Sequence, residues 1–277
     1  IAPPLAETLY SADSLCGGVN RLKSKVADSS LAPLGEKSYQ WARDHMPALT
    51  RIIDKLTDKK PFEGRRLGVC LHVTKETSVL IQGLVKLGGE VYLCAANPLS
   101  TQDDIAAYLA SRGIAVYAWR GETEKEYFDC IRTVLKAQPQ IVMDDGADVH
   151  VTLHEDPSYT FSIFGGTEET TTGVIRLKAL EKAGKLRYPV IAVNNAYTKF
   201  LFDNRYGTGQ STIDGILRAT SLLIAGKRVV VCGYGWVGKG IARRARGLDA
   251  HIIVTEADPL KALEAHMDGF QVMPIHE

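Results

Sequence analysis

The sequence predicts an α/β protein in which a Rossmann-like parallel-sheet domain is followed by an incomplete Rossmann domain. Short apolar runs alternate with segments of helical periodicity along most of the 277 residues. This is the pattern of parallel strands that are covered by helices on both faces. A later strand runs directly into a glycine-rich GxGxxG loop, which is typical of a second α/β unit. The length exceeds one ordinary core, so we expect two domains, 1–207 and 208–277.

The predicted elements of the first domain follow one another closely. Residues 1–35 mix Pro, Gly and Ser without a sustained period, so an extended entry segment is expected there, and 146–168 is expected to be irregular. The alternating pattern predicts strands at 66–72, 90–95, 115–118, 141–143 and 189–193, and helices at 37–56 with an interruption at Pro47, 77–87, 101–112, 124–136, 173–184 and 215–224.

Polar residues stand where several of these strands end. His72, Asn97 and Asp145 each close or follow an apolar run. Ligands of open parallel sheets bind beyond the carboxyl ends of the strands. These three residues are therefore candidates for a binding site.

The glycine loop of the second domain predicts dinucleotide binding. Gly233 permits the tight turn, Gly235 allows the backbone to approach a pyrophosphate, and Gly238 allows the helix to pack close to the strand. The amino terminus of the helix attracts the phosphates. Glu256 would accept hydrogen bonds from the adenosine ribose and repel a 2′-phosphate, which favours NAD over NADP. The surrounding elements are predicted as strands 228–232, 251–255 and 271–275 and a helix at 239–248.

The chain ends at Glu277, before the number of strands that a complete dinucleotide fold needs. Two interpretations follow. The sequence is a fragment of a longer protein, or it is a short protein that does not turn over substrate.

Composition excludes several classes of protein. The net charge of +1 provides no broad basic field for nucleic acid or anionic lipid. Five cysteines without a CxxC pair indicate reduced thiols. No apolar run has the roughly 20 residues of a membrane span, and the first residues lack the pattern of a signal peptide. We expect a soluble, cytoplasmic protein.

Several motifs in one order resemble S-adenosylhomocysteine hydrolase from about Val26 to Val272. The version of the motif at 206–211 is similar to the archaeal and thermophile-type branch. The motifs are Cys70-Leu-His-Val-Thr-Lys-Glu76, Ser100-Thr-Gln-Asp103, Tyr117-Ala-Trp-Arg-Gly-Glu122, Asp144-Asp-Gly-Ala-Asp148, Glu168-Glu-Thr-Thr-Thr-Gly173, Asn194-Asn-Ala-Tyr-Thr-Lys199, Phe202-Asp-Asn-Arg-Tyr-Gly207 and the glycine loop.

The resemblance implies hydrolysis of S-adenosylhomocysteine to adenosine and homocysteine, with bound NAD transiently oxidising the ribose 3′-hydroxyl. It implies that Lys199 and Asp203 act at that hydroxyl, that Asp145 is the acid or base near C4′, and that His72 serves the leaving thiolate. It also implies a homo-oligomer, either a dimer or a tetramer, with no resident metal. The implied substrate residues are Thr74, Glu76, Asp145, Glu169, Asn194, Lys199 and Asp203, and the implied cofactor residues are Thr170, Thr171, Thr172, Asn204, Gly233, Gly235, Trp236, Val237, Gly238, Lys239, Gly240, Glu256 and Lys261.

Structural roles compete with each functional one. Lys199 and Asp203 lie four apart, as in an ordinary surface ion pair. Paired acids before a glycine are common in turns and helix caps. His150 and His154 also lie four apart, but without an expected helix or a third ligand they do not predict zinc.

Three other functions stay open. A relative that acts on S-inosylhomocysteine would read a hypoxanthine carbonyl, whereas the carboxylate of Glu76 suits the exocyclic amine of adenine. A non-catalytic paralogue would keep the pocket without the chemistry. An ordinary NAD dehydrogenase would accumulate NADH with its substrate.

Two departures from the family pattern concern the cofactor. Thr208 stands where many members carry a cysteine near the nicotinamide. Lys261 replaces a common asparagine near the adenosine, which weakens the preference for NAD that Glu256 indicates. Asn195 replaces a common aspartate.

Overall fold

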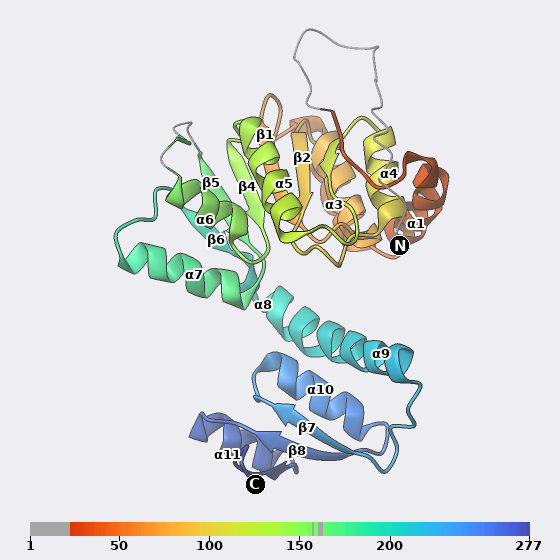
Figure 1. The fold of residues 1–277 in the computed structure, drawn as a ribbon, viewed down its shortest axis with the longest axis vertical. Helices are drawn as coiled ribbons and strands as arrows, with labels where there is room; N and C mark the ends of the chain where they lie inside the picture. Colours follow the sequence, from red (N-terminus) through yellow and green to blue (C-terminus); the bar gives the residue numbers. More distant parts are fainter. Residues whose placement is uncertain (1–22, 157, 160–162) are drawn as a thin grey trace. The chain divides into compact units, whose positions relative to one another are not determined.

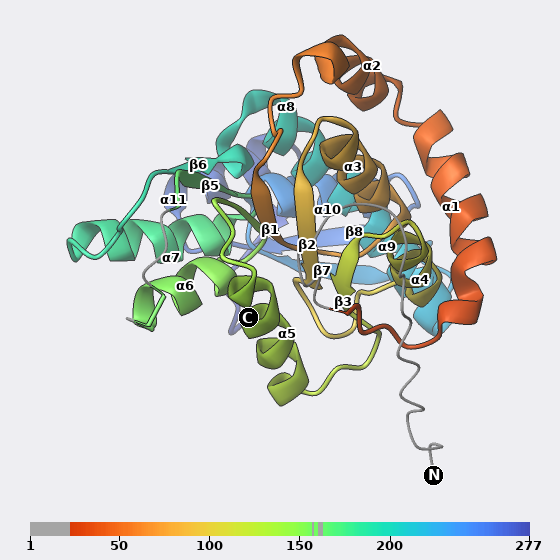
Figure 2. The same cartoon turned by 90° about the horizontal axis from the view of Figure 1, so that it is seen from above.

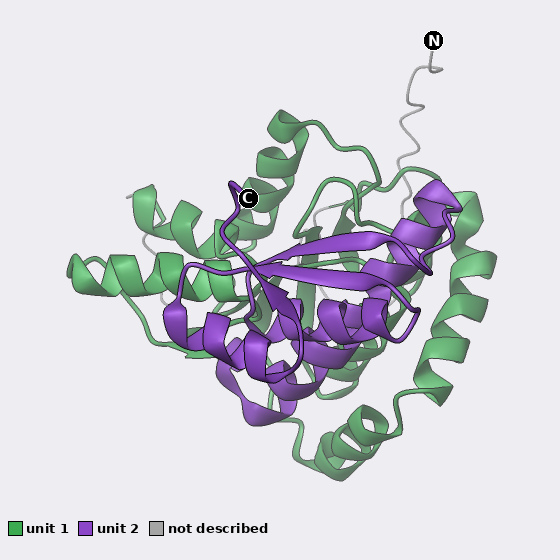
Figure 3. Ribbon diagram, turned by 90° about the horizontal axis from the view of Figure 1, so that it is seen from below, with its two compact units in different colours: residues 1–192 green, residues 193–277 purple. Residues whose placement is uncertain are grey.

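The computed structural model describes residues 23–156, 158–159 and 163–277 (Figure 1). The chain divides into two compact units, Ile1–Ala192 and Val193–Glu277, which Figure 3 colours separately. Most of the predicted entry segment, including Cys16, lies outside the described residues. In the described ranges no helix combines the length and apolar character that crossing a bilayer requires.

The first unit contains a six-stranded parallel sheet with helices on both faces (Figure 1). Every predicted strand and helix of 37–184 occurs within a few residues of its expected position, and the chain breaks between α1 and α2 before Pro47 as predicted. The strands are β1 (Arg66–Leu71), β2 (Glu90–Ala95), β3 (Ala115–Tyr117), β4 (Ile141–Asp144), β5 (Gly165–Glu168) and β6 (Val190–Ala192), and the helices are α1 (Ala32–Asp44), α2 (Pro47–Leu56), α3 (Lys75–Lys86), α4 (Asp103–Ser111), α5 (Glu124–Lys136), α6 (Asp148–Glu155) and α7 (Thr171–Lys182), with short 3₁₀ turns at Ser29–Leu31 and Thr57–Lys59.

The strand order is β3-β2-β1-β4-β5-β6, and all neighbours are parallel. The order reverses between β1 and β4, where Leu67 is in register with Ile141 and Cys70 with Asp144. This is the strand order of a doubly wound dinucleotide-type fold. A crevice for ligands is expected beyond the carboxyl ends of β1 and β4.

Alternating side chains of the strands build two apolar layers. Leu67, Val69 and Leu71 of β1 belong to a cluster shared with α3 and α4, whereas Cys70 belongs to a second cluster shared with α5. Successive strand residues point to opposite faces, so each layer is covered by its own helices. Figure 2 shows α3 and α4 on one side of these strands and α5 on the other.

The prediction that 146–168 is irregular is wrong, because this range contains α6 and β5. β5 reads Gly-Gly-Thr-Glu and has no apolar run. A Cβ added at Gly166 would collide with the ring of His150, so close packing of α6 on the sheet requires glycine in this strand. The same helix supplies the helical context for His150 and His154 that the sequence had not indicated.

The second unit has a three-stranded parallel sheet, β7-β8-β9. Its core includes Ile213, Val231 and Tyr234. The strands are β7 (Arg228–Cys232), β8 (His251–Thr255) and β9 (Gln271–Val272), and the helical segments are a 3₁₀ turn (Val193–Asn195), α8 (Tyr197–Lys199), a π-helix (Phe200–Gly207), α9 (Thr208–Thr220), α10 (Trp236–Arg246) and α11 (Pro259–Met267).

The division between units falls after Ala192, earlier than the predicted boundary after 207. A Cβ at Gly209 would lie 2.7 Å from the backbone of Gly240, and one at Gly240 would collide with the carbonyl of Arg205. The π-helix and α9 therefore pack backbone-to-backbone on α10. This contact, which the sequence pattern does not display, joins 193–207 to the second unit.

The interior strand β2 should contribute strongly to stability. Leu93 is fully buried, so Leu93→Ala is expected to lower the free energy of unfolding by about 2–5 kcal/mol through lost burial and a cavity. Urea titration followed by circular dichroism measures this change. Leu34→Ala is the matched control because Leu34 is 55% exposed, and an equal loss in both variants would contradict the assigned core.

Candidate functional site

Two polar side chains meet where the strand order of the first sheet reverses. His72 follows β1 and Asp145 follows β4, and His72 Nε2 lies 3.5 Å from Asp145 Oδ2. The Asp145 side chain is 16% exposed and that of His72 is 44% exposed. A partly buried carboxyl beside an accessible imidazole can exchange protons with a bound ligand.

Ser100 orients the imidazole of His72. The Ser100 hydroxyl donates to the carbonyl of Asn97 (3.1 Å), and its oxygen lies 2.7 Å from His72 Nδ1. This contact fixes the ring so that Nε2 faces Asp145. The Ser-Thr-Gln-Asp motif contains Ser100, but no spacing along the chain indicated its contact with His72.

Thr74 and Glu76 lie at the amino end of α3, directly after His72. The Thr74 hydroxyl caps the helix by accepting from the amide of Thr77 at 3.4 Å, and the Thr74 amide donates to the His72 carbonyl at 2.9 Å. The Glu76 side chain is half exposed. These contacts place His72, Thr74 and Glu76 at one edge of the sheet.

The loop that carries Asp145 is tied to two buried carboxyls. Asp144 Oδ1 accepts from the amide of Asp145 at 2.9 Å, and Oδ2 accepts from the amide of His150 at 3.0 Å. Glu168 Oε1 accepts from the amides of Gly146 and Thr170, each at 2.9 Å. Both carboxyls are almost completely buried. They hold the ends of β4 and β5 together.

Burial controls the protonation of this cluster. It raises the pKa of Asp144 to about 7, and the nearby Glu168 carboxylate adds to the rise. Burial also raises the pKa of Glu168, against the effect of the amides of Gly146 and Thr170. The pKa of His150 falls to about 4, again mainly through burial. Desolvation disfavours the charged form of each group.

Asp144, His150 and Glu168 form the group of possible metal ligands found among the described residues, with ligand atoms within 4.8 Å of one another. However, His150 Nδ1 lies 2.9 Å from the Tyr188 hydroxyl and Nε2 lies 3.2 Å from the Thr167 carbonyl. A neutral imidazole that donates from Nε2 and accepts at Nδ1 has no lone pair left for a metal. The chemistry of this group therefore does not favour a metal centre.

Glu169 and the three threonines follow β5. The Glu169 amide donates to the Asp144 carbonyl at 3.0 Å, so Glu169 is attached to the same strand ends. Thr170 is the N-cap of α7, and its side chain makes no capping hydrogen bond. Thr171 and Thr172 occupy the exposed first turn. The amide of Thr170 donates to Glu168 Oε1 at 2.9 Å instead.

In the second unit, the ammonium group of Lys199 lies near two polar side chains. Lys199 Nζ donates to Asn194 Oδ1 at 3.0 Å and lies 3.6 Å from Asp203 Oδ2. The Lys199 side chain is only 12% exposed, whereas that of Asp203 is 62% exposed. An ordinary surface pair would expose both partners. The i,i+4 ion pair that the spacing indicated is present, but the Lys199 side chain lies mostly below the surface.

The π-helix Phe200–Gly207 carries Asp203 and Asn204. Such segments are rare and often occur at functional sites. Asn204 Oδ1 is buried and has no hydrogen-bond partner. Buried amide oxygens normally have a partner, so this atom is consistent with contact to a bound group.

The glycine loop has the geometry that a dinucleotide requires. Gly233 has a φ of +99°, and a Cβ at Gly238 would collide with the carbonyl of Gly233. A Cβ at Gly235 would meet nothing within 4 Å. Gly235 is the N-cap of α10, and its helix end has no side-chain cap. The amides of Trp236, Val237 and Gly238 in the first helical turn are therefore suited to phosphate.

Glu256 follows β8 and faces the same loop. Its Oε2 accepts from the amide of Tyr234 at 2.6 Å and its Oε1 from that of Asp258 at 3.0 Å. These amides lower the pKa of Glu256. A charged carboxylate here repels a 2′-phosphate. Lys261 Nζ lies 3.3 Å from Asp258 Oδ2, so a neighbouring carboxylate offsets its charge.

Two predicted cofactor residues have evident structural roles. Lys239 is buried and pairs with Glu264 at 2.6 Å. Gly240 provides the close approach to Arg205. The residues of this loop nevertheless fit NAD, because the open Gly235 and the uncapped helix end remain available. NAD would supply reversible oxidation of a substrate alcohol.

Two family models match these two units. The model of S-adenosyl-L-homocysteine hydrolase matches residues 23–162. The model of the NAD binding domain of S-adenosyl-L-homocysteine hydrolase matches residues 204–277. This chain belongs to the S-adenosyl-L-homocysteine hydrolase family. The NAD predicted from the glycine loop is the cofactor that the second model indicates.

The curated relatives of this chain are named for two different activities. Adenosylhomocysteinase of Sulfurisphaera tokodaii is 62% identical over 251 residues, which are 91% of this chain and 60% of the relative. S-inosyl-L-homocysteine hydrolase of Methanocaldococcus jannaschii is 54% identical over 254 residues, which are 91% of this chain and 61% of the relative. The chain thus spans about 60% of the length of these curated relatives.

A solved structure is also similar at low identity. The crystal structure of a dipicolinate synthase chain from Bacillus halodurans aligns with a TM-score of 0.47 and 14% identity, over 78% of this chain and 70% of that chain.

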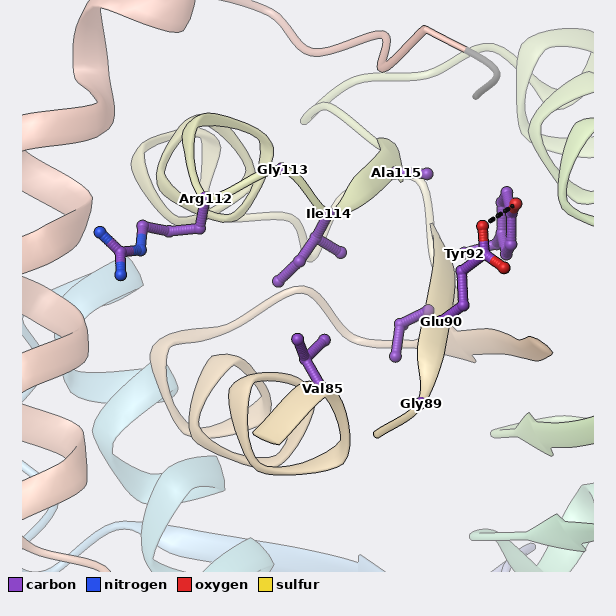
Figure 4. A pocket seen from close by; sticks show the side chains of 9 residues that line it. Val85, Gly89, Glu90, Tyr92, Arg112, Gly113, Ile114 and Ala115 are labelled. Carbon is purple, nitrogen blue, oxygen red and sulfur yellow. Dashed lines mark hydrogen bonds between the residues drawn. The ribbon is translucent and has the colours of Figure 1, made fainter. Parts of the chain in front are cut away.

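A small cavity in the first unit lies away from the family motifs. It has a volume of about 130 Å³ and is lined by Glu90, Tyr92 and Arg112, among others. Figure 4 shows these side chains around the amino ends of β2 and β3, with the Tyr92 hydroxyl donating to Glu90 at 2.7 Å. His72 and Asp145 follow the carboxyl ends of strands. This cavity is therefore at the opposite edge of the sheet.

The close approach at Gly238 should be essential to the family's cofactor loop. Gly238→Ala is expected to cost about 1–3 kcal/mol in unfolding free energy by overpacking and to weaken NAD binding. Calorimetric titration with NAD measures the second effect. Gly215→Ala is the matched control because an added Cβ there meets nothing within 4 Å. Unchanged NAD affinity in Gly238→Ala would contradict the loop assignment.

Proposed function

We propose that this chain forms the substrate domain and the first part of the NAD domain of an enzyme that reversibly hydrolyses S-adenosyl-L-homocysteine to adenosine and homocysteine. The pairing of His72 with Asp145 at the reversal of strand order supports this proposal most directly. Membership of the family supports it independently. Bound NAD supplies transient oxidation of the ribose 3′-hydroxyl, which acidifies the C4′ proton.

The residues of the first unit serve the carbon–sulfur bond and the base. Asp145 removes the C4′ proton, and the homocysteine thiolate leaves from C5′ as the double bond forms. His72 takes that proton from Asp145 through Nε2, which faces it, and delivers it to the leaving thiolate. His72 then positions the water that adds to C5′ and returns a proton of that water to Asp145, which protonates C4′. Ser100 holds the His72 ring in this orientation. Thr74 and Glu76 read the adenine, and Glu169 holds the ribose.

The residues of the second unit serve the 3′-hydroxyl and the cofactor. Lys199 accepts the hydroxyl proton, and Asp203 and Asn194, which contact its ammonium group, orient it. Substrate also contacts Asn194 and Asp203. The proposed cofactor residues of the second unit are Asn204, Gly233, Gly235, Trp236, Val237, Gly238, Lys239, Gly240, Glu256 and Lys261, and the first unit contributes Thr170, Thr171 and Thr172.

The proposed oligomeric state, location and metabolic role of the protein follow from the same family. We propose a homo-oligomer, a dimer or a tetramer, that works in the cytoplasm within the S-adenosylmethionine cycle of one-carbon metabolism. Its partners are small molecules, and neither nucleic acid nor a membrane is expected to bind. The near-neutral charge supports this proposal.

Lys199→Met should abolish most of the activity. In the full-length protein that contains this chain, loaded with NAD, we expect kcat for adenosine release to fall about 10²–10⁴-fold because the general base is lost. Chromatographic measurement of adenosine gives the rate. The matched control is Arg218→Met, which removes an exposed i,i+4 pair with Asp214 in the same unit.

The products of the wild-type reaction distinguish the hydrolase from the alternative functions. Release of adenosine without net accumulation of NADH supports the hydrolase. Net NADH at completion would instead indicate a dehydrogenase, and retention of adenosine without any turnover would indicate a binding protein. Either of these results would overturn the proposal.

S-inosyl-L-homocysteine is a second candidate substrate because the relative from Methanocaldococcus jannaschii is named for it. Glu76 favours adenine, since a carboxylate accepts from an exocyclic amine but repels the hypoxanthine carbonyl. Wild type is expected to prefer the adenosyl substrate, and Glu76→Gln, whose amide can also donate, should shift the ratio of kcat/KM towards the inosyl substrate by about tenfold. An unchanged ratio would show that Glu76 does not read the base.

A further inference from the structure

The loop that presents Asp145 has a backbone that few residues adopt. Gly146 has a φ of +116°, and Ala147, which is fully buried, has a φ of +66°. A left-handed alanine costs free energy and persists only when surrounding contacts determine it. Something in the fold must therefore hold this turn in place.

The buried carboxyls of Asp144 and Glu168 supply those contacts. The two residues are in register on β4 and β5, and between them they accept from the amides of Asp145, Gly146, His150 and Thr170. In their ionised form these carboxylates make stronger hydrogen bonds with amides than neutral acceptors do. The carboxyl of Glu168 thereby joins the turn after β4 to the start of α7.

Glu168 has no space to move. A Cβ added at Gly173 would collide with the carboxyl group of Glu168, so the helix α7 packs its backbone directly against this side chain. Glu168 Oε2 is buried without a hydrogen-bond partner. The cost of burying this oxygen indicates a role beyond general stability.

We propose that Glu168, supported by Asp144, is a positioning residue that sets the location of Asp145 for the proposed hydrolysis through the amides of the 145–147 turn. It touches no substrate in this role. The inference rests on the proposed function for its kinetic consequence, but the geometric part concerns the first unit alone. Arg176 reinforces the turn from the other side by donating to the Gly146 carbonyl and to Asp148.

The kinetic test replaces the accepting oxygen without changing the length of the side chain. In the full-length, NAD-loaded protein, Glu168→Met is expected to lower kcat about 100-fold with little change in KM, because displacing a catalytic group by about 1 Å has this effect. Glu168→Gln keeps Oε1 as an acceptor and should retain most of kcat. In an Asp145→Asn background, Glu168→Met should cause little further loss.

Glu122 provides a matched control. It is also a buried carboxyl with one unpartnered oxygen, its Oε1 accepts from the amide of Trp119 at 2.9 Å, and burial raises its pKa to about 7. It lies after β3, outside the proposed machinery. Glu122→Met should therefore lower stability but leave kcat unchanged.

A second variant moves the carboxyl without removing it. Gly173→Ala should displace Glu168 and lower kcat in the same way, although alanine in a helix otherwise stabilises. Retention of kcat by both Gly173→Ala and Glu168→Met, in an active wild type, would overturn the inference.

Hydrogen exchange tests the positioning without reference to activity. In the 277-residue chain, Glu168→Met should increase exchange at the amides of Gly146 and Thr170, whereas Glu122→Met should not. Unchanged protection in Glu168→Met would overturn the inference even if adenosine is released. Increased exchange in a protein that releases no adenosine would refute the proposed function and support the positioning. A stoichiometric metal that is present in the wild type and lost in Glu168→Met would also overturn it, since Glu168 would then be a ligand.

Discussion

The hydrogen bonds from backbone amides to the two carboxyls at the ends of β4 and β5 are the interaction on which the site of the first unit depends. In a parallel sheet the carboxyl ends of the strands lie at one edge, but this arrangement does not determine the backbone conformation of the segment after each strand. Asp144 and Glu168 determine that conformation by accepting hydrogen bonds from the amides that follow them. As a result Asp145 faces His72 across the point where the strand order reverses.

A different constraint governs the second unit, namely the space that side chains would occupy. Gly233 adopts a backbone that favours glycine, Gly238 allows α10 to approach β7, and Gly209 and Gly240 allow α9 to approach α10. Where a Cβ would meet nothing, at Gly235, the backbone is open to a ligand. The same residue type thus serves packing at some positions and recognition at another.

The chemistry of the site follows from how each polar group is partnered. Ser100 fixes the orientation of the His72 ring, and Asn194 holds Lys199 beside Asp203. Charged and polar groups that are partly buried in this way keep a fixed orientation at low cost in entropy. Glu168 Oε2 and Asn204 Oδ1 are exceptions, since both are buried without a hydrogen-bond partner, and Asn204 lies in the π-helix that also carries Asp203.

The sequence by itself determined the alternation of strands and helices, the glycine loop with Glu256, and the motifs that identify the family, because these features are local in the chain. Only the tertiary structure revealed β5, whose glycines carry no apolar signal, and the contact of His72 with Ser100. It also revealed that Glu168 reaches the amide of Gly146 and that only 12% of the Lys199 side chain is exposed. These features depend on which elements pack together, and packing between residues far apart in the chain leaves no periodic trace in the sequence.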